Sequence, residues 1–193
     1  MRIITGKARG VKLSALEGED ITRPTGDRVK EGLFSAIQFE LEGKRVLDLF
    51  SGSGQLALEA LSRGAESAVL IDESEKAVEI IKENAKKTGL MKQCRIARQD
   101  YSEYLKSASG REKFGLVFLD PPYAKDIPNE VLKKLCRADI VAPGGLVVCE
   151  SDRDDMMGNL YDLTYRKTYK YGRTYITIFE KNVENFGKEE EHE

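Results

Sequence analysis

The segment Arg45-Val46-Leu47-Asp48-Leu49-Phe50-Ser51-Gly52-Ser53-Gly54 decides the fold. Residues 45–50 form a mostly apolar run that predicts a buried strand, and the two glycines after it allow a tight loop into a helix. The same succession of a short apolar run, a turn and an amphipathic stretch recurs along the chain. Strands that are apolar on both faces and alternate with helices are typical of a doubly wound α/β fold with a mostly parallel sheet.

The pattern assigns most of the expected elements. Strands are expected at 45–50, 67–71, 94–97, 114–119 and 146–150, with Pro143-Gly144-Gly145 as a turn before the last of them. Helices are expected between these strands and also after Thr25, which can act as an N-cap; Ser74 can cap a later helix in the same way. Residues 163–171 and 174–179 are rich in Tyr, Thr and Ile, and they predict an antiparallel hairpin at the sheet edge.

Composition narrows the class of protein. The 193 residues are 40% hydrophobic and 33% charged, as in an ordinary globular chain, and no apolar run is long enough to cross a membrane. The first residues show no signal peptide. Three cysteines and one histidine make no metal pattern, so we expect a cytoplasmic protein without metal and with reduced thiols. The net charge of −2 does not indicate nucleic acid, although residues 1–30 carry seven basic against four acidic residues.

Acidic residues close four successive strands of the predicted sheet. They are Asp48, Asp72, Asp100 and Asp120. The carboxyl ends of parallel strands meet at one edge of the sheet, where ligands bind in open α/β folds. Asp is common in turns, which explains one or two of these residues but poorly explains four. The pattern therefore indicates a ligand site along this edge.

The glycine loop raises two cofactor hypotheses. With Ala57 the loop satisfies G-x-G-x-x-A, and Asp72 lies at about the spacing of a ribose-binding acid, as in enzymes that bind NAD. Asp48 would repel a pyrophosphate, however, whereas it would attract the ammonium of S-adenosylmethionine. In that cofactor the ribose would bind Asp72 and the adenine amino group would bind Asp100. Charge therefore favours S-adenosylmethionine over NAD.

A rigid corner, Asp120-Pro121-Pro122-Tyr123, follows the apolar run 114–119. The prolines end the strand and restrict the backbone, and they keep Asp120 out of the helical region. The corner offers a carboxylate, a carbonyl oxygen and an aromatic ring. This set of groups can hold a flat ring and accept hydrogen bonds from its amino group.

These two segments resemble a known family. Asp48–Gly54 looks like motif I of class I S-adenosylmethionine-dependent methyltransferases, and Asp120–Tyr123 looks like their motif IV for methylation of amino nitrogen. Further segments resemble the bacterial RsmD family, which methylates the exocyclic N2 of one guanosine in 16S ribosomal RNA. They are Arg2–Gly10, Arg23–Glu31, Leu58–Ala65 and Tyr171–Thr174. The similarity covers about residues 1–181.

The resemblance implies a role for each matching residue. The expected cofactor-binding residues are Asp48, Ser51, Gly52, Gly54, Asp72 and Asp100. The expected catalytic residues are Asp120, Pro121 and Tyr123. The expected RNA-binding residues are Arg23, Thr25, Arg28 and Pro122. The implied partner is 16S ribosomal RNA within a partly assembled small subunit, and we expect the enzyme to act as a monomer.

The resemblance also implies a domain organisation and leaves rival functions open. We expect an N-terminal extension at 1–40, a methyltransferase domain at 41–183 and an acidic, disordered tail at 184–193. One rival methylates adenine N6 in DNA or RNA, or a glutamine amide in protein. Others are a non-catalytic RNA-binding scaffold and an NAD-dependent oxidoreductase. Binding of S-adenosylhomocysteine against NAD would separate the last two.

Overall fold

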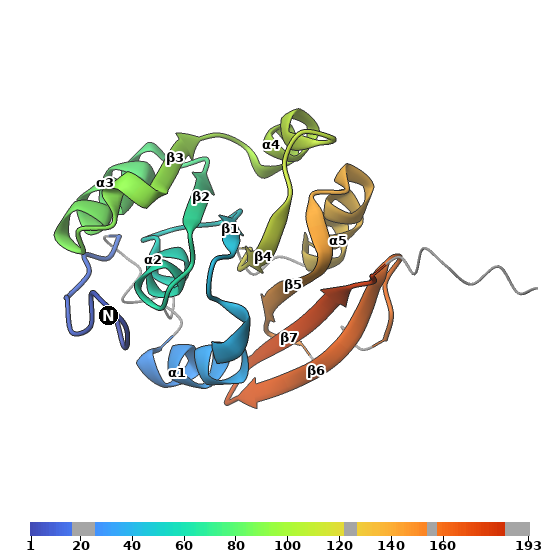
Figure 1. Ribbon diagram of the computed structural model, residues 1–193, viewed down its shortest axis with the longest axis horizontal. Helices are drawn as coiled ribbons and strands as arrows, with labels where there is room; N and C mark the ends of the chain where they lie inside the picture. Colours follow the sequence, from blue (N-terminus) through green and yellow to red (C-terminus); the bar gives the residue numbers. More distant parts are fainter. Residues whose placement is uncertain (17–25, 122–126, 154–157, 184–193) are drawn as a thin grey trace, which may run out of the picture.

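The computed structural model describes residues 1–16, 26–121, 127–153 and 158–183. One seven-stranded sheet, in the order β3-β2-β1-β4-β5-β7-β6, carries helices on both faces (Figure 1). The strands are β1 (Arg45–Asp48), β2 (Ser67–Asp72), β3 (Cys94–Arg98), β4 (Phe114–Leu119), β5 (Val141–Ser151), β6 (Leu163–Tyr171) and β7 (Thr174–Lys181). The helices are α1 (Asp27–Ala36), α2 (Gln55–Ser62), α3 (Glu75–Lys87), α4 (Tyr101–Ala108) and α5 (Ile127–Ala138), with short 3₁₀ turns η1 (Gln38–Glu40) and η2 (Met91–Gln93).

The strand order places a switch point in the middle of the sheet. β1 pairs in parallel with β2 on one side and with β4 on the other. β7 runs antiparallel to both β5 and β6, so the chain ends in the hairpin that the sequence predicts. In sheets of this kind ligands bind beyond the carboxyl ends of the strands where the order reverses. The expected doubly wound fold with an antiparallel edge is confirmed.

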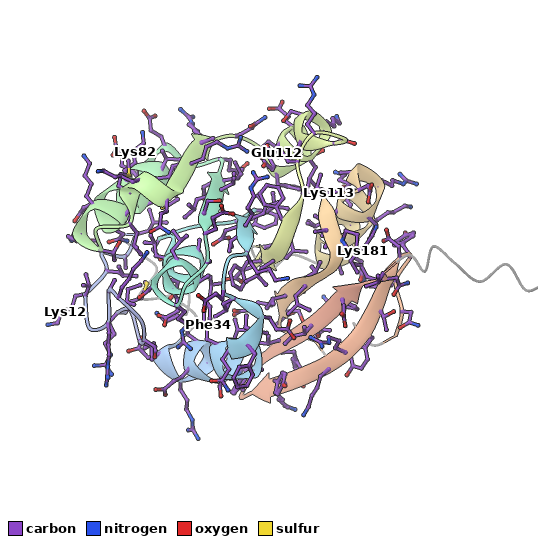
Figure 2. All side chains as sticks on the ribbon, viewed as in Figure 1. Lys12, Phe34, Lys82, Glu112, Lys113 and Lys181 are labelled. Atoms are coloured by element: carbon purple, nitrogen blue, oxygen red, sulfur yellow. The ribbon has the colours of Figure 1, made fainter. Side chains whose placement is uncertain are left out.

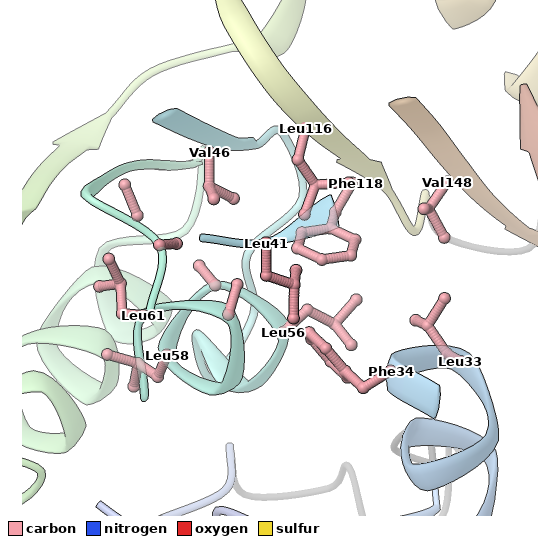
Figure 3. Packing of buried hydrophobic residues seen from close by; sticks show 14 of the residues in the cluster. Leu33, Phe34, Leu41, Val46, Leu56, Leu58, Leu61, Leu116, Phe118 and Val148 are labelled. Atoms are coloured by element: carbon pink, nitrogen blue, oxygen red, sulfur yellow. The ribbon is translucent and has the colours of Figure 1, made fainter. Parts of the chain in front are cut away.

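Two hydrophobic clusters cover the two faces of the sheet. On one face α1, α2 and α3 pack against the strands, and Figure 3 shows Phe34 of α1 near Leu56 of α2 and Phe118 of β4. The Phe34 and Phe118 ring centroids are 5.8 Å apart. On the other face α4 and α5 contribute Leu105 and Leu132 to a second cluster. Because both faces are buried, the strands read as continuous apolar runs.

Two local predictions are wrong. Pro143-Gly144-Gly145, predicted as a turn, lies inside β5, since Val141 pairs with Phe114 and the register then shifts before the next pair. A bulge admits proline and glycine within a strand. The N-cap of α1 is Gly26 and not Thr25, and it makes no side-chain capping bond. The Ser74 cap is confirmed, because its side chain accepts a hydrogen bond from the Ala77 N–H at 3.3 Å.

The N-terminal residues fold back against α2 and α3. Arg2 and Lys12 form an isolated antiparallel β-bridge through their backbones. Ile3 and Leu13 are buried in the same hydrophobic cluster as residues of α1 and α2. Gly6 lies so close to the Ser62 carbonyl that a Cβ atom would overlap it. Figure 2 shows Lys12 projecting away from the molecule. The acidic tail lies outside the described residues. Within the described ranges, no helix has both the length and the apolar character that a membrane span requires.

Candidate functional site

The four acids of the sequence prediction lie along one edge of the sheet. Asp48 and Asp72 end β1 and β2, Asp100 follows β3, and Asp120 follows β4. These four strands are neighbours in the order β3-β2-β1-β4, and all are parallel. Asp48 and Asp120 therefore lie on either side of the switch point.

Asp48 is a buried carboxylate that the protein satisfies only in part. The residue is 1% exposed, and the backbone N–H groups of Phe50 and Ala57 lie close enough to its carboxylate to lower its pKa. Its Oδ1 atom has no hydrogen-bond partner within the described part of the chain. Burial raises the pKa of Asp48 to about 7, and the charge of Asp72 adds to the rise, while the two backbone N–H groups oppose it. Such a group favours a cationic ligand.

The glycine loop is fixed by the acids on either side of it. The Gly52 N–H donates to Asp72 Oδ2 at 2.9 Å, and the buried Ser51 hydroxyl donates to the Asp48 carbonyl at 2.9 Å. Gly54 has φ 78°, and a Cβ atom there would lie 3.2 Å from a leucine methyl of β2. Glycine at position 54 thus permits both the left-handed backbone and the close packing of the loop on β2.

Asp72 and Asp100 already hold backbone groups. Besides binding Gly52, Asp72 accepts the Ser74 N–H on Oδ1 at 2.9 Å. Asp100 caps α4, because its Oδ1 accepts the N–H groups of Ser102 at 2.9 Å and Glu103 at 3.1 Å. A ligand amino group would therefore bind Asp100 through Oδ2. The capping role of Asp100 was not predicted from the sequence.

The remaining predicted site residues fall into two groups. Asp120 is half-buried at the end of β4, Pro121 beside it is buried, and Arg28 is exposed on α1. Four further residues lie outside the described residues: Arg23, Thr25, Pro122 and Tyr123. Among the described residues, no group of three or more His, Cys, Asp or Glu side chains is arranged to hold a metal ion.

Asn84 is a buried residue near the site that the sequence prediction missed. It is 0% exposed, and its side chain accepts the Ser14 N–H at 2.8 Å and donates to the carbonyls of Ser14 and Ser53, both at 2.9 Å. It therefore ties the glycine loop and the N-terminal segment to α3. The sequence could have indicated that Asn84 is buried, because it follows Ala77 and Ile81 at helical spacing on the apolar side of α3.

A second buried polar cluster holds the N-terminal segment on α2. The Glu59 carboxylate accepts the N–H groups of Ile4 at 2.7 Å and Thr5 at 3.0 Å and pairs with Arg63 Nε at 2.8 Å. Lys30 Nζ of α1 lies 3.7 Å from Glu59 Oε2, and both side chains of this ion pair are fully buried. Lys30 Nζ also donates a hydrogen bond to the Arg2 carbonyl. Burial lowers the pKa of Lys30, and the charge of Glu59 opposes that change. The sequence could have indicated this cluster, because Glu59 is a charged residue within an otherwise mostly apolar helix.

Comparison with known proteins identifies the family. The family model described as conserved hypothetical protein 95 matches residues 1–180. The chain belongs to this family. A putative rRNA methyltransferase, YlbH, of Bacillus subtilis is 38% identical over 94% of this chain and 99% of the relative. The ribosomal RNA small subunit methyltransferase D of Haemophilus influenzae is 34% identical over 80% of each chain.

A solved methyltransferase structure shares the fold of this chain. A putative methyltransferase, yhhF, from Escherichia coli superposes with a TM-score of 0.83 at 28% identity, covering 95% of this chain and 98% of that one. The class I methyltransferase fold and the resemblance to the RsmD family, which the sequence motifs indicated, are thereby confirmed.

Proposed function

We propose that this chain is an S-adenosylmethionine-dependent methyltransferase acting on the exocyclic N2 of a guanosine in 16S ribosomal RNA. The names of its relatives support methylation of small-subunit ribosomal RNA. The observation that best supports S-adenosylmethionine as the methyl donor is the buried Oδ1 of Asp48, which lies beside the glycine loop and has no partner among the described residues. The choice of guanine N2 rests on the resemblance to the RsmD family.

The residues along the edge fit this cofactor. The unpaired Asp48 oxygen can accept a hydrogen bond from an ammonium group, which stabilises the charged form of the carboxylate. Each Asp72 oxygen binds one backbone N–H and keeps a second lone pair for a ribose hydroxyl. Asp100 Oδ2 would accept the adenine amino group. Several carboxylates close together would repel the pyrophosphate of NAD, which argues against the oxidoreductase.

The corner after β4 would hold the target amino group. When bound, the cofactor supplies a methyl group already activated by its sulfonium. The Asp120 carboxylate and the Pro121 carbonyl would accept the two N–H bonds of guanine N2, which localises the nitrogen lone pair toward the methyl group. Because β4 pairs with β1, these acceptors would lie beside the Asp48 end of the proposed site. Alignment of the amino group with the methyl group would then contribute much of the rate. The proton leaving the nitrogen would pass to Asp120.

The resemblance assigns the target base to the corner as well. By that resemblance, Tyr123 would stack on the extruded base beside Pro122, and Arg23 and Thr25 would close over the cofactor or position the RNA. Arg28 of α1 and Arg173, in the turn between β6 and β7, would bind phosphates nearby. Other basic side chains would add phosphate contacts: Arg2, Lys7, Arg9, Lys12, Arg166, Lys167 and Lys170.

The hairpin turn lies at the same edge as the corner. Tyr175, just after the turn, pairs with Ser151 at the carboxyl end of β5, and β5 runs parallel to β4. A phosphate bound by Arg173 would therefore belong to nucleotides close to the target base. A partly assembled small subunit can present such a folded RNA surface to a monomeric enzyme.

The test is methyl transfer to small-subunit RNA, as naked RNA and as partly assembled particles, followed by mass spectrometry of the nucleosides. The expected product is N2-methylguanosine. Asp120→Ala should abolish product formation while S-adenosylhomocysteine still binds, and the exposed Asp152→Ala is the matched control. N6-methyladenosine, or methylated glutamine in a ribosomal protein, would overturn the guanine assignment. Binding of NAD but not of S-adenosylhomocysteine would overturn the methyltransferase.

A further inference from the structure

Gln55 is a buried amide whose acceptor atom has no partner. It opens α2 directly after Gly54 and is 7% exposed. Its Oε1 atom makes no hydrogen bond to any part of the chain that the structure describes. Leaving a buried amide oxygen unpaired costs folding free energy, and most buried polar side-chain atoms in proteins have a hydrogen-bond partner.

Gln55 differs from the other polar residues on its side of α2, because those residues have hydrogen-bond partners within the protein. Glu59 lies one turn further along the helix, and Ser62 follows at the next turn, so the three residues share one side of α2. Glu59 binds the N-terminal backbone, and the Ser62 hydroxyl accepts the Ala8 N–H at 3.0 Å. The neighbouring Leu56 packs into the core near Phe34 (Figure 3). Of this polar row, Gln55 alone has an unpaired acceptor, and it lies at the end that meets the glycine loop.

A second unpaired acceptor lies at the same helix end. The backbone N–H of Ala57, two residues after Gln55, lies close enough to the Asp48 carboxylate to lower its pKa, so Asp48 lies beside the first turn of α2. Its Oδ1 is also buried without a partner among the described residues. No side chain caps α2, because the N-cap is Gly54. Two of the three unpaired buried acceptors among the described residues, Asp48 Oδ1 and Gln55 Oε1, therefore belong to residues at this helix start, and the third, Asp162 Oδ1, belongs to the segment before β6.

We propose that Gln55 binds the amino-acid end of the cofactor, with Oε1 accepting a hydrogen bond from the ammonium group that Asp48 also binds. The inference rests on the proposed function. An ammonium carries three N–H donors, and the single free Asp48 oxygen satisfies one of them. Gln55 supplies a further acceptor within the same turn of helix. It adds no charge to a site that already holds two carboxylates.

This role predicts opposite effects on stability and on affinity. Gln55→Met keeps the length of the side chain and removes the unpaired amide, so the ligand-free protein should melt at a higher temperature than wild type. The same variant should bind S-adenosylhomocysteine about 10- to 100-fold more weakly, since a hydrogen bond to a charged group is lost. Gln55→Glu keeps an acceptor and should retain the affinity. A glutamine with a purely structural role would lose stability and affinity together.

The experiment compares two ligands by calorimetry. S-adenosylhomocysteine carries the amino-acid end, and 5′-methylthioadenosine lacks it but keeps the adenosine. Gln55→Met should weaken the first ligand and leave the second unchanged. Gln38→Met, at an exposed glutamine of η1, is the matched control and should bind both ligands like wild type.

Other results would overturn the proposal. Equal losses for the two ligands would show a general distortion of the site. Unchanged S-adenosylhomocysteine binding with reduced RNA methylation would assign Gln55 to the target base instead. If wild-type protein does not bind S-adenosylhomocysteine at all, the proposed function itself fails and this inference fails with it.

Discussion

The hydroxyl of Tyr171, at the end of β6, lies directly against Gly32 in the middle of α1. A Cβ atom at position 32 would overlap the hydroxyl oxygen and lie 2.6 Å from the ring carbon Cζ. Glycine inside a helix costs about 1 kcal/mol relative to alanine. Because Gly32 has no side chain, α1 can approach the hairpin of β6 and β7. Packing between these two segments offsets the loss of helix stability that the glycine causes.

Gly32→Ala should destabilise the protein by about 1–2 kcal/mol, because the Tyr171 ring must leave its packing position and that loss exceeds the gain in helix propensity. In a Tyr171→Ala background the same substitution should become stabilising by up to about 1 kcal/mol. Urea denaturation of the four proteins in this double-mutant cycle measures the coupling. Additive effects would show that the two residues do not constrain each other.

The raised pKa of Asp48 predicts a pH-dependent stability in the absence of ligand. Its pKa of about 7 in the folded protein lies above the ordinary aspartate pKa of 3.8, so its stabilising contribution is complete below about pH 4 and is lost as the pH rises through 7. Relative to Asp48→Asn, wild type should therefore lose up to about 4 kcal/mol between pH 4 and pH 8. Thermal unfolding of both proteins across this range checks the difference, and a flat difference would contradict the buried carboxylate.

The same carboxylate predicts how cofactor binding responds to pH. Because an ammonium ligand favours the charged carboxylate, the affinity of wild type for S-adenosylhomocysteine should increase as the pH rises from 6 to 7.5. Titrations in buffers of different ionisation enthalpy should show proton release on binding near pH 7. Asp48→Asn should bind more weakly and should lack this proton release.

Glu59→Gln should destabilise the protein by about 3–5 kcal/mol, because Lys30 would remain as a buried charge without its counterion. The amide also has one acceptor oxygen in place of two, so one of the Ile4 and Thr5 N–H groups loses its partner. Hydrogen exchange at these two amides should accelerate.

A matched pair of variants tests the cause of that loss. The exposed Glu66→Gln should have no measurable effect on stability. Lys30→Met in the Glu59→Gln background should recover part of the stability, since it removes the unpaired charge. A further loss in this double variant would contradict the ion-pair explanation.

Arg173→Ala should weaken binding of small-subunit RNA, because the exposed side chain lies in the hairpin turn, at the same edge of the sheet as the candidate site. The slope of log K against log salt should fall by about 1, while S-adenosylhomocysteine binding stays unchanged. The exposed Arg111→Ala, in the turn before β4 at the opposite edge of the sheet, is the control. An equal effect of both variants would indicate general charge attraction only.

Local patterns predicted the elements well where one physical signal dominated. The apolar run 114–119 is β4 as predicted, and Ser74 caps α3, because burial and capping depend on near neighbours in the chain. The turn predicted at residues 143–145 is wrong, since pairing with β4 holds that segment in the sheet despite its proline and glycines. The cap formed by Asp100 was also not predicted from the sequence. A carboxylate at a strand end can cap the following helix and still bind a ligand with its other oxygen, and the sequence pattern does not distinguish the two roles.

By itself, the sequence determined the alternation of strands and helices, the four acids at the strand ends and the family, because these depend on the order of residues along the chain. Only the tertiary structure decided which polar groups are satisfied. Glu59 meets a lysine and a backbone segment far away in the sequence, whereas Asp48 and Gln55 are buried with an acceptor unpaired. Hydrogen-bond satisfaction depends on packed neighbours that can be far apart in the sequence. Three buried acceptors lack a partner among the described residues, and two of them belong to Asp48 and Gln55, which flank the glycine loop; the third is Asp162 Oδ1.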